Sequence, residues 1–211
     1  MTFDRLEKLT FQNIVELLGV FAFAMSGAFS AMQKRLDVFG VLVLTFVTAI
    51  GGGTVRDVLI GSMPVAWIQD LELIYVMFFA FFISIFFSKK LQKMEHALFW
   101  LDTAGLAFFC IVAIEKGIQF HLHPIICIAL GTITGSFGGI IRDVLLNEIP
   151  YVFRKDVYAS ACIAGGILYF ILLHVINDAN LIGILAGILI MLIRIGAKYF
   201  KWSMPDIYRF R

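Results

Sequence analysis

An apolar run of the chain contains Gly51-Gly52-Gly53-Thr54-Val55-Arg56-Asp57-Val58-Leu59, three glycines followed closely by two charged residues. A related stretch lies 86 residues later. This offset takes Gly52, Gly53, Arg56, Asp57, Val58, Leu59 and Pro64 onto Gly138, Gly139, Arg142, Asp143, Val144, Leu145 and Pro150. In a membrane-spanning region, glycines favour irregular backbone and charged residues mark ion pathways. Glycines beside charges therefore predict that both features occur at the same place.

The composition predicts a membrane protein. Hydrophobic residues make up 61% of the chain and charged residues 15%, and the mean hydropathy is +0.93. A soluble domain has about 45–50% apolar and about 25% charged residues. The net charge of +2 is too small to indicate a nucleic-acid partner. Cys110, Cys127 and Cys162 lie in apolar segments without ligand-like spacing, so we expect core residues, no metal site and no cofactor.

Seven segments are apolar and long enough for spanning helices, which need about 20 residues each. They cover residues 11–32, 38–60, 69–88, 97–116, 124–146, 157–176 and 179–200. The connections between them are short and leave no room for an extramembrane domain. The sequence therefore predicts an all-α membrane protein with seven transmembrane helices.

Basic residues in the connections predict the orientation. Three lie on the side of the N-terminus: Arg5, Lys8 and Lys116. Eleven lie on the other side: Lys34, Arg35, Lys89, Lys90, Lys93, Arg154, Lys155, Lys198, Lys201, Arg209 and Arg211. Because cytoplasmic loops carry the excess of Lys and Arg, we expect the N-terminus outside and the C-terminus in the cytoplasm.

The 86-residue offset extends beyond the glycine stretch. It takes Glu16 onto Asp102, and Asp70 onto Asp156. We therefore expect two copies of one three-helix unit, residues 1–96 and 97–178, followed by a seventh helix and a tail in residues 179–211. Because three is odd, the second copy enters the membrane from the opposite side, an inverted repeat typical of transport proteins.

The glycines have two interpretations. Gly51, Gly52 and Gly53, like Gly138 and Gly139, weaken a helix and predict a bend or break, whose freed carbonyls would border a polar path. Alternatively, they let helices pack closely, as small residues do in bilayers. The nearby hydroxyls are equally ambiguous, because they can line a pore or bond to carbonyls of their own helix. They belong to Thr48, Thr134 and Ser136.

The charged residues predict two ion pairs. Adjacent helical residues do not face each other, so Arg56 and Asp57 are not assumed to pair. We expect Glu16 to pair with Arg56, and Asp102 with Arg142 at the matching depth in the other leaflet. This arrangement leaves Asp57 and Asp143 to face the polar path, although both could equally serve as structural contacts. Arg194 is expected to extend to the cytoplasmic interface.

The paired glycine and Arg-Asp stretches, each followed by a Pro, resemble the prokaryotic TRIC (trimeric intracellular cation) channel group, also known as the bacterial glycine-transporter domain family. The resemblance covers nearly the whole chain. It implies a homotrimer in the inner membrane of a prokaryote, with one pore per protomer for K⁺, Na⁺ or other monovalent cations. The second and fifth helices, kinked at Gly51–Gly53 and Gly138–Gly139, would line each pore.

This sequence departs from a perfect repeat at one kink position. Phe137 stands where the first copy has Gly51, so the second kink is expected to be weaker or shifted. The Lys-Glu-Val phosphoinositide motif of animal TRIC channels has no clear match, so that lipid site is not expected; bilayer lipids remain expected partners.

Three other functions were considered. A secondary carrier of glycine or another small amino acid fits the same inverted repeat. A purely structural or lipid-binding trimer is a further alternative. We predict that the chain is not an enzyme, because we find neither a metal-ligand set nor a nucleophile with a base at a recognisable spacing.

Overall fold

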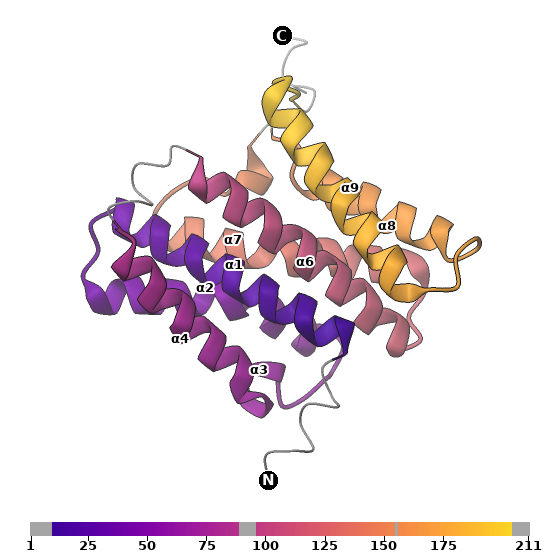
Figure 1. The fold of residues 1–211 in the computed structure, drawn as a ribbon, viewed down its shortest axis with the longest axis horizontal. Coiled ribbons are helices and arrows are strands. Elements are labelled where there is room, and N and C mark those ends of the chain that lie inside the picture. The colour runs from indigo at the N-terminus through magenta and orange to yellow at the C-terminus, as the bar shows by residue number, and fades with distance from the viewer. Residues whose placement is uncertain (1–9, 89–95, 155, 204–211) are drawn as a thin grey trace.

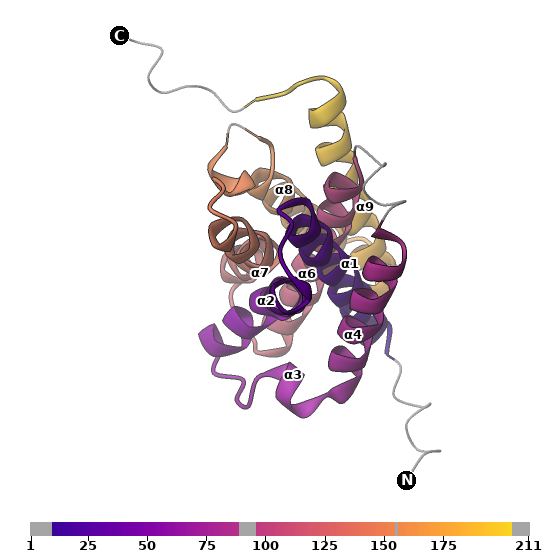
Figure 2. The same cartoon turned by 90° about the vertical axis from the view of Figure 1, so that its left-hand side faces the viewer.

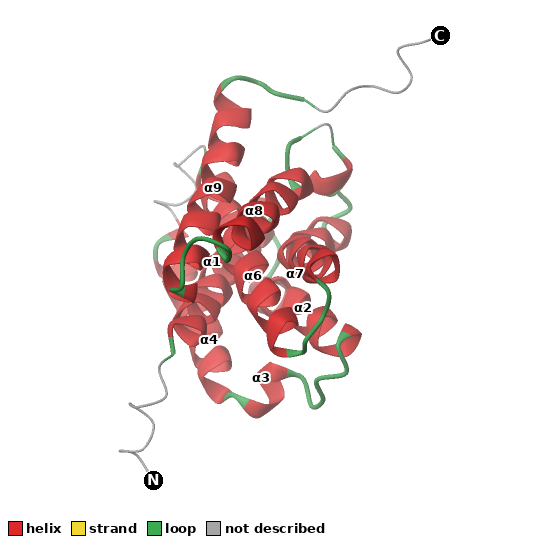
Figure 3. Ribbon diagram, turned by 90° about the vertical axis from the view of Figure 1, so that its right-hand side faces the viewer, coloured by secondary structure: helices red, strands yellow, loops and turns green. Residues whose placement is uncertain are grey.

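A computed structural model describes residues 10–88, 96–154 and 156–203. Within these ranges the chain forms helices joined by loops (Figure 3). The longer helices are α1 (Phe11–Gln33), α2 (Val38–Leu59), α4 (Leu71–Phe86), α6 (Ala97–Gln119), α7 (Pro124–Leu145), α8 (Ala159–Leu172) and α9 (Ala179–Tyr199). The short elements are α3 (Ala66–Gln69) and the 3-10 helix η2 (Tyr151–Phe153).

Five of the described helices are long and apolar enough to cross a bilayer: α1, α2, α6, α7 and α9, with 21 to 23 residues each. The apolar helices α4 and α8 are shorter, with 16 and 14 residues. The prediction of an all-helical, multi-pass membrane protein is confirmed. The predicted segments 69–88 and 157–176 are longer than the helices α4 (Leu71–Phe86) and α8 (Ala159–Leu172) that lie within them, and each of these helices follows a short one, α3 or η2.

Polar residues fix where the helices begin. The Asp37 carboxylate accepts a hydrogen bond from the Gly40 amide at 2.7 Å, at the start of α2. Asp178 does the same for the first turn of α9, accepting from Asn180 at 2.9 Å. These carboxylates satisfy amide groups that lack a partner within the helix, so each apolar run starts at a defined residue.

The centre of the molecule is formed by α1 and α6, which pack against each other (Figure 1). On one side of them α2 and α7 lie side by side (Figure 2). The helix α4 packs on α1, whereas α8 and α9 pack together beside α6 and α7. One apolar cluster joins α1, α2, α4 and α6, and another joins α6 to α9. The contact of α2 with α7 and of α1 with α6 therefore joins the two halves of the chain.

The backbone repeats at the same offset as the sequence. Left-handed residues follow α1 at Arg35 and α6 at His121, with φ of 57° and 54°. Another pair follows α2 at Gly61 and α7 at Asn147, with φ of 69° and 55°. All four positions end a helix in the same way, so residues 86 apart adopt the same local structure.

Some residues used to predict the orientation lie outside the described ranges: Arg5, Lys8, Lys89, Lys90, Lys93, Lys155, Arg209 and Arg211. The described basic residues Lys34, Arg154 and Lys198 lie near the ends of α1, α7 and α9. That is one common face of the bundle, and it is the face predicted to be cytoplasmic.

Candidate functional site

Both glycine-rich helices run without interruption through their glycines. The predicted break is therefore absent from this conformation, whereas a bend within a continuous helix stays a prediction. A Cβ atom added to Gly52 would lie 2.2 Å from the Thr134 carbonyl oxygen, and one added to Gly138 would lie 2.4 Å from the Thr48 carbonyl oxygen. Only glycine permits this backbone contact between α2 and α7, so the close-packing interpretation holds for these two residues.

The remaining glycines differ in their surroundings. A Cβ on Gly51 would lie 2.7 Å from the Ile141 side chain, and one on Gly139 would lie 2.9 Å from the Tyr158 hydroxyl. A Cβ on Gly53 would meet no atom closer than Arg56 Nη2 at 3.9 Å. Gly53 therefore has room for a Cβ atom beside the buried Arg56 guanidinium group, without the close helix contact made by Gly52.

The predicted hydroxyls lie beside the glycine contact and bond within their own helices. Thr48 donates to the Leu44 carbonyl at 2.6 Å, and Thr134 donates to the Leu130 carbonyl at 2.7 Å. Ser136 likewise donates to the Thr132 carbonyl. Each hydroxyl oxygen keeps its lone pairs as acceptors, so these bonds do not exclude contact with water or a cation.

A first charge cluster joins three helices, α1, α2 and α6. Arg56 Nη2 lies 3.0 Å from Glu16 Oε1, and Arg56 Nε lies 2.8 Å from Asp57 Oδ1. Lys116 Nζ reaches the same Asp57 oxygen at 2.7 Å. Glu16, Arg56, Asp57 and Lys116 thus hold two negative and two positive charges. A small cavity lined by Glu16, Thr54 and Asp57 adjoins this first cluster.

A second charge cluster joins α1, α6, α7 and α9. Arg142 Nη1 lies 2.9 Å from Asp102 Oδ1, and its Nε lies 2.8 Å from Asp143 Oδ1. Arg194 Nη1 lies 3.2 Å from the other oxygen of Asp102. Asp102, Arg142, Asp143 and Arg194 again hold two charges of each sign, and Ser26 accepts a further bond from Arg142 at 2.5 Å. The second cluster is almost wholly buried.

The two predicted ion pairs, Glu16 with Arg56 and Asp102 with Arg142, are present. Asp57 and Asp143 make the structural contacts that were the alternative interpretation, and each pairs with the arginine before it, a pair that helix geometry had not led us to assume. Each also accepts a backbone N–H from the start of the next short helix, from Ala66 of α3 at 2.8 Å and from Tyr151 of η2 at 3.3 Å. Each of these amide groups holds the aspartate carboxylate near the end of its helix, within reach of the preceding arginine side chain. That the two aspartates face a polar path stays a prediction.

Lys116 and Arg194 complete the clusters and were missed as site residues. Arg194 was expected at the membrane interface but is only 5% exposed, because Asp102 binds its guanidinium group inside the bundle. Each residue is a charge within an otherwise apolar helix, which is a signal for a functional position or an ion pair. This signal was available in the sequence.

Each central arginine keeps hydrogen-bonding capacity. Among the described residues, Arg56 Nη1 and Arg142 Nη2 have no hydrogen-bond partner. A Cβ on Gly139 would lie 3.7 Å from Arg142 Nη2, much as Gly53 borders Arg56. Buried unpartnered donors next to glycines mark places where water or a ligand oxygen can bind.

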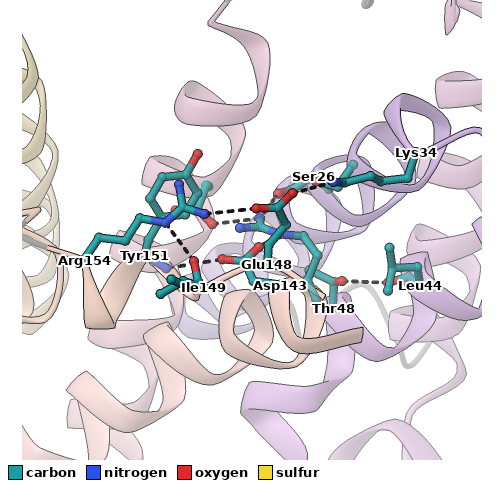
Figure 4. A network of polar contacts seen from close by, with 12 residues as sticks. Ser26, Lys34, Leu44, Thr48, Asp143, Glu148, Ile149, Tyr151 and Arg154 are labelled. Atoms are coloured by element: carbon teal, nitrogen blue, oxygen red, sulfur yellow. Dashed lines mark hydrogen bonds and ion pairs between the residues drawn. The ribbon is translucent and has the colours of Figure 1, made fainter. Parts of the chain in front are cut away.

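A third polar network lies at the face where α1 and α7 end. Figure 4 shows Glu148 between Lys34 and Arg154. Glu148 accepts from Lys34, and Arg154 Nη2 lies 3.7 Å from its other oxygen. The Lys34 ammonium lowers the pKa of the Glu148 carboxyl below its ordinary value. This network ties the two halves together on one face, and Ser62, the counterpart of Glu148, carries no charge.

Within the described ranges, no group of three or more His, Cys, Asp or Glu side chains is arranged to hold a metal ion. The cysteines Cys110, Cys127 and Cys162 are buried and free, as core residues are.

Comparison with known proteins gives two matches to one family model. The model described as a glycine transporter matches residues 13–89 and again residues 99–174. These ranges begin 86 residues apart, the offset found in the sequence and in the backbone. The family unit is therefore present twice.

Relatives of similar length are known from bacteria. A UPF0126 membrane protein of Vibrio cholerae is 38% identical, covering 91% of this chain and 81% of the relative. The UPF0126 inner membrane protein YadS of Escherichia coli is also 38% identical, covering 90% of this chain and 93% of the relative.

Solved structures of TRIC channels have the same fold. The TRIC trimeric intracellular cation channel orthologue from Rhodobacter sphaeroides superimposes with a TM-score of 0.85 at 29% identity, covering 90% of this chain and 98% of that chain. A structure that describes conductance through TRIC cation channels gives a TM-score of 0.81 at 30% identity, covering 98% of this chain and 97% of that chain.

Proposed function

The chain belongs to the glycine transporter family and to the TRIC group, and we propose that it is a channel for monovalent cations, with K⁺ or Na⁺ as the permeant ion. The observation that carries this proposal is the pair of charge clusters. Eight charged side chains lie inside an apolar bundle, four at each end of the contact between α2 and α7. Charges inside a bilayer are costly and mark ion pathways.

The proposed path runs within one protomer between the two halves of the chain. It passes the first cluster, the hydroxyls of Thr48 and Thr134, and the second cluster. In the present conformation Gly52 and Gly138 bring α2 and α7 into backbone contact, which closes the path. A bend at these glycines would separate the helices and free carbonyl oxygens for a partly dehydrated cation.

The topology that supports this path is the predicted one. It has seven spans, with residues 1–96 and 97–178 as inverted units and residues 179–211 as an added helix and tail. The N-terminus lies outside. By likeness to the TRIC orthologue, whose name describes a trimer, the assembly is a homotrimer with one pore in each protomer.

Transport of glycine or another small amino acid is the second candidate, favoured by the description of the matching family model. A carboxylate could bind the unpartnered guanidinium N–H groups, and an amine could bind Asp57 or Asp143. The solved structures with this fold are described as channels rather than enzymes, which supports the prediction that the chain has no catalytic activity.

Reconstitution into vesicles separates the two candidates. We expect K⁺ efflux down its gradient that does not saturate and does not require glycine. Saturable uptake of labelled glycine, driven by a proton or sodium gradient and without K⁺ flux, would overturn the channel proposal. Empty vesicles and vesicles holding an unrelated membrane protein serve as controls.

A further inference from the structure

A pocket lies between α6, α9 and η2, on the face where α9 ends. Its lining includes Phe99, Tyr151, Arg194, Lys198 and Trp202. Its volume is about 190 Å³. Sites that hold a whole drug-sized molecule measure about 300–1,000 Å³. This α9 pocket is therefore suited to one small polar group of a larger molecule.

Two cations one helical turn apart give the pocket its chemistry. Arg194 is 5% exposed, and its Nε has no hydrogen-bond partner among the described residues. Lys198 Nζ lies 3.9 Å from the centre of the Phe99 ring and has no acidic partner within 4.0 Å among the described residues. The lining thus contains one guanidinium group with a buried, unpartnered Nε and one ammonium group that contacts an aromatic face.

Aromatic side chains mark the level of this pocket relative to the membrane. Trp100, Tyr199 and Trp202 are 51%, 80% and 54% exposed near the start of α6 and the end of α9. Exposed Trp and Tyr residues gather at the height of the lipid headgroups. The cations of the α9 pocket therefore lie where the phosphate groups of a bilayer lie.

We propose that the α9 pocket binds the phosphate group of an anionic lipid headgroup. A guanidinium and an ammonium group are the usual ligands of phosphate, and each forms charge-assisted hydrogen bonds with its oxygens. Basic pockets between transmembrane helices on the cytoplasmic side suit such headgroups. Asp156, an exposed residue of the lining, would disfavour a second anion and limits the pocket to one phosphate group.

Arg194 connects this pocket to the second cluster. Its Nη1 lies 3.2 Å from Asp102 Oδ2, while Asp102 Oδ1 holds Arg142. A phosphate group bound in the pocket competes with Asp102 for the charge of the Arg194 guanidinium group. Occupation of the pocket would therefore weaken the ion pair between Arg194 and Asp102. An effect of this change on permeation rests on the proposed function, whereas the binding of the lipid does not.

Binding can be tested without measuring transport. Protein in nanodiscs of phosphatidylcholine is compared with protein in nanodiscs that also contain phosphatidylglycerol, and native mass spectrometry counts the phosphatidylglycerol molecules retained per chain. We expect one tightly retained molecule in the wild type and about fivefold weaker retention in Lys198→Gln, as the loss of one basic residue predicts. Lys198→Arg should retain the lipid, which shows that the charge matters and that the variant folds.

The matched control is Lys201→Gln, which removes an exposed charge from the same end of the chain but outside the pocket lining. It should retain the lipid as the wild type does. An equal loss in Lys201→Gln and Lys198→Gln would overturn the proposal in favour of general surface attraction. Equal retention of phosphatidylcholine and phosphatidylglycerol would also overturn it.

A second arm identifies the source of the phosphate. Inorganic phosphate is added to protein in phosphatidylcholine alone, and the thermal unfolding midpoint is measured for the wild type and Lys198→Gln. Stabilisation of the wild type only would support phosphate recognition by a soluble ligand. Lipid retention that depends on Lys198, without this stabilisation, would support the lipid headgroup. Neither effect in either arm would refute the proposal.

Discussion

The two charge clusters share a plan but differ in burial and in their additional partners. In both, an arginine on the glycine-rich helix binds the next aspartate and an acid on the preceding helix. The first cluster adds Lys116, whose side chain is 18% exposed, and borders a cavity. The second adds Arg194 and Ser26 and is nearly sealed. The duplicated arginine, aspartate and second acid form the same ion pairs in both clusters. The additional residues determine how exposed each cluster is.

Neutrality depends on these unduplicated residues. Within each copy the duplicated charges sum to minus one, and Lys116 or Arg194 cancels the excess. The position equivalent to Lys116 in the first copy is the uncharged Ser30, and Arg194 lies on α9, outside both copies. An accessible lysine can be displaced by a permeant cation more readily than a buried arginine. We infer that the first cluster exchanges cations, while the second stabilises the packing of α6, α7 and α9.

The largest expected effect comes from removing the arginine of the second cluster. Arg142→Met leaves Asp143 without a charged partner and Asp102 with Arg194 alone, and breaking such a buried pair costs about 3–5 kcal/mol. Arg56→Met should cost less, because Asp57 keeps Lys116 and Glu16 is partly exposed. Thermal unfolding of both variants in detergent measures the difference. Equal losses would contradict the assignment of the second cluster as the structural one.

The next effect concerns the contact that both halves share. Gly52→Ala places a Cβ 2.2 Å from a backbone carbonyl, and such overpacking costs about 1–3 kcal/mol or more. Gly53→Ala is the matched control, because the nearest atom to its Cβ is Arg56 Nη2 at 3.9 Å and alanine favours a helix by about 1 kcal/mol. We expect a lower unfolding midpoint for the first variant only. Similar midpoints would mean that α2 and α7 are not in close contact.

A smaller and purely electrostatic effect is expected from Lys116→Met. The first cluster then carries a net negative charge, which should increase the preference for K⁺ over Cl⁻ in the reversal potential of bilayer currents. Lys34→Met removes an exposed lysine outside both clusters and should leave the preference unchanged. A shift of the same size in both variants would exclude a specific role of Lys116.

The smallest effect is a dependence on acid pH. The pKa of Glu148 is lowered in the folded protein by Lys34, so this contact stabilises the protein above the ordinary carboxyl pKa of 4.5 and is lost as the pH falls through the lowered folded-state pKa. Glu148→Gln should therefore lower the unfolding midpoint slightly at neutral pH and lose less on acidification than the wild type. Parallel pH profiles for both proteins would contradict this role.

Local patterns predicted much of the fold. Apolar runs of about 20 residues located every long helix, because a spanning helix needs that length. The 86-residue offset located the partners of Arg56 and Arg142, because duplicated residues occupy equivalent places. The sequence left open whether the glycines bend the helix or allow close packing, since close packing against a carbonyl depends on the neighbouring helix rather than on the sequence around the glycine.

The positions of Asp57 and Lys116 could not be derived in this way. The carboxylate of Asp57 is oriented by the Ala66 amide, which returns to it through a loop whose path is set by tertiary contacts. Lys116 lies on α6, 59 residues along the chain from Asp57, and its equivalent in the first copy is the uncharged Ser30. Residues that break a repeat are the ones that the repeat cannot predict.

The central claim is that the two copies approach one cation path from opposite faces of the membrane. Thr54 borders the cavity of the first cluster, and Ile140 is its counterpart in the second copy.

Thr54→Cys and Ile140→Cys are recorded in planar bilayers with K⁺ while a membrane-impermeant cationic thiol reagent is added to one side at a time. The wild type is the control, because its cysteines are buried. We predict block of Thr54→Cys from the outer side only and of Ile140→Cys from the cytoplasmic side only. Block of both from the same side, or unchanged currents in both, would contradict the account.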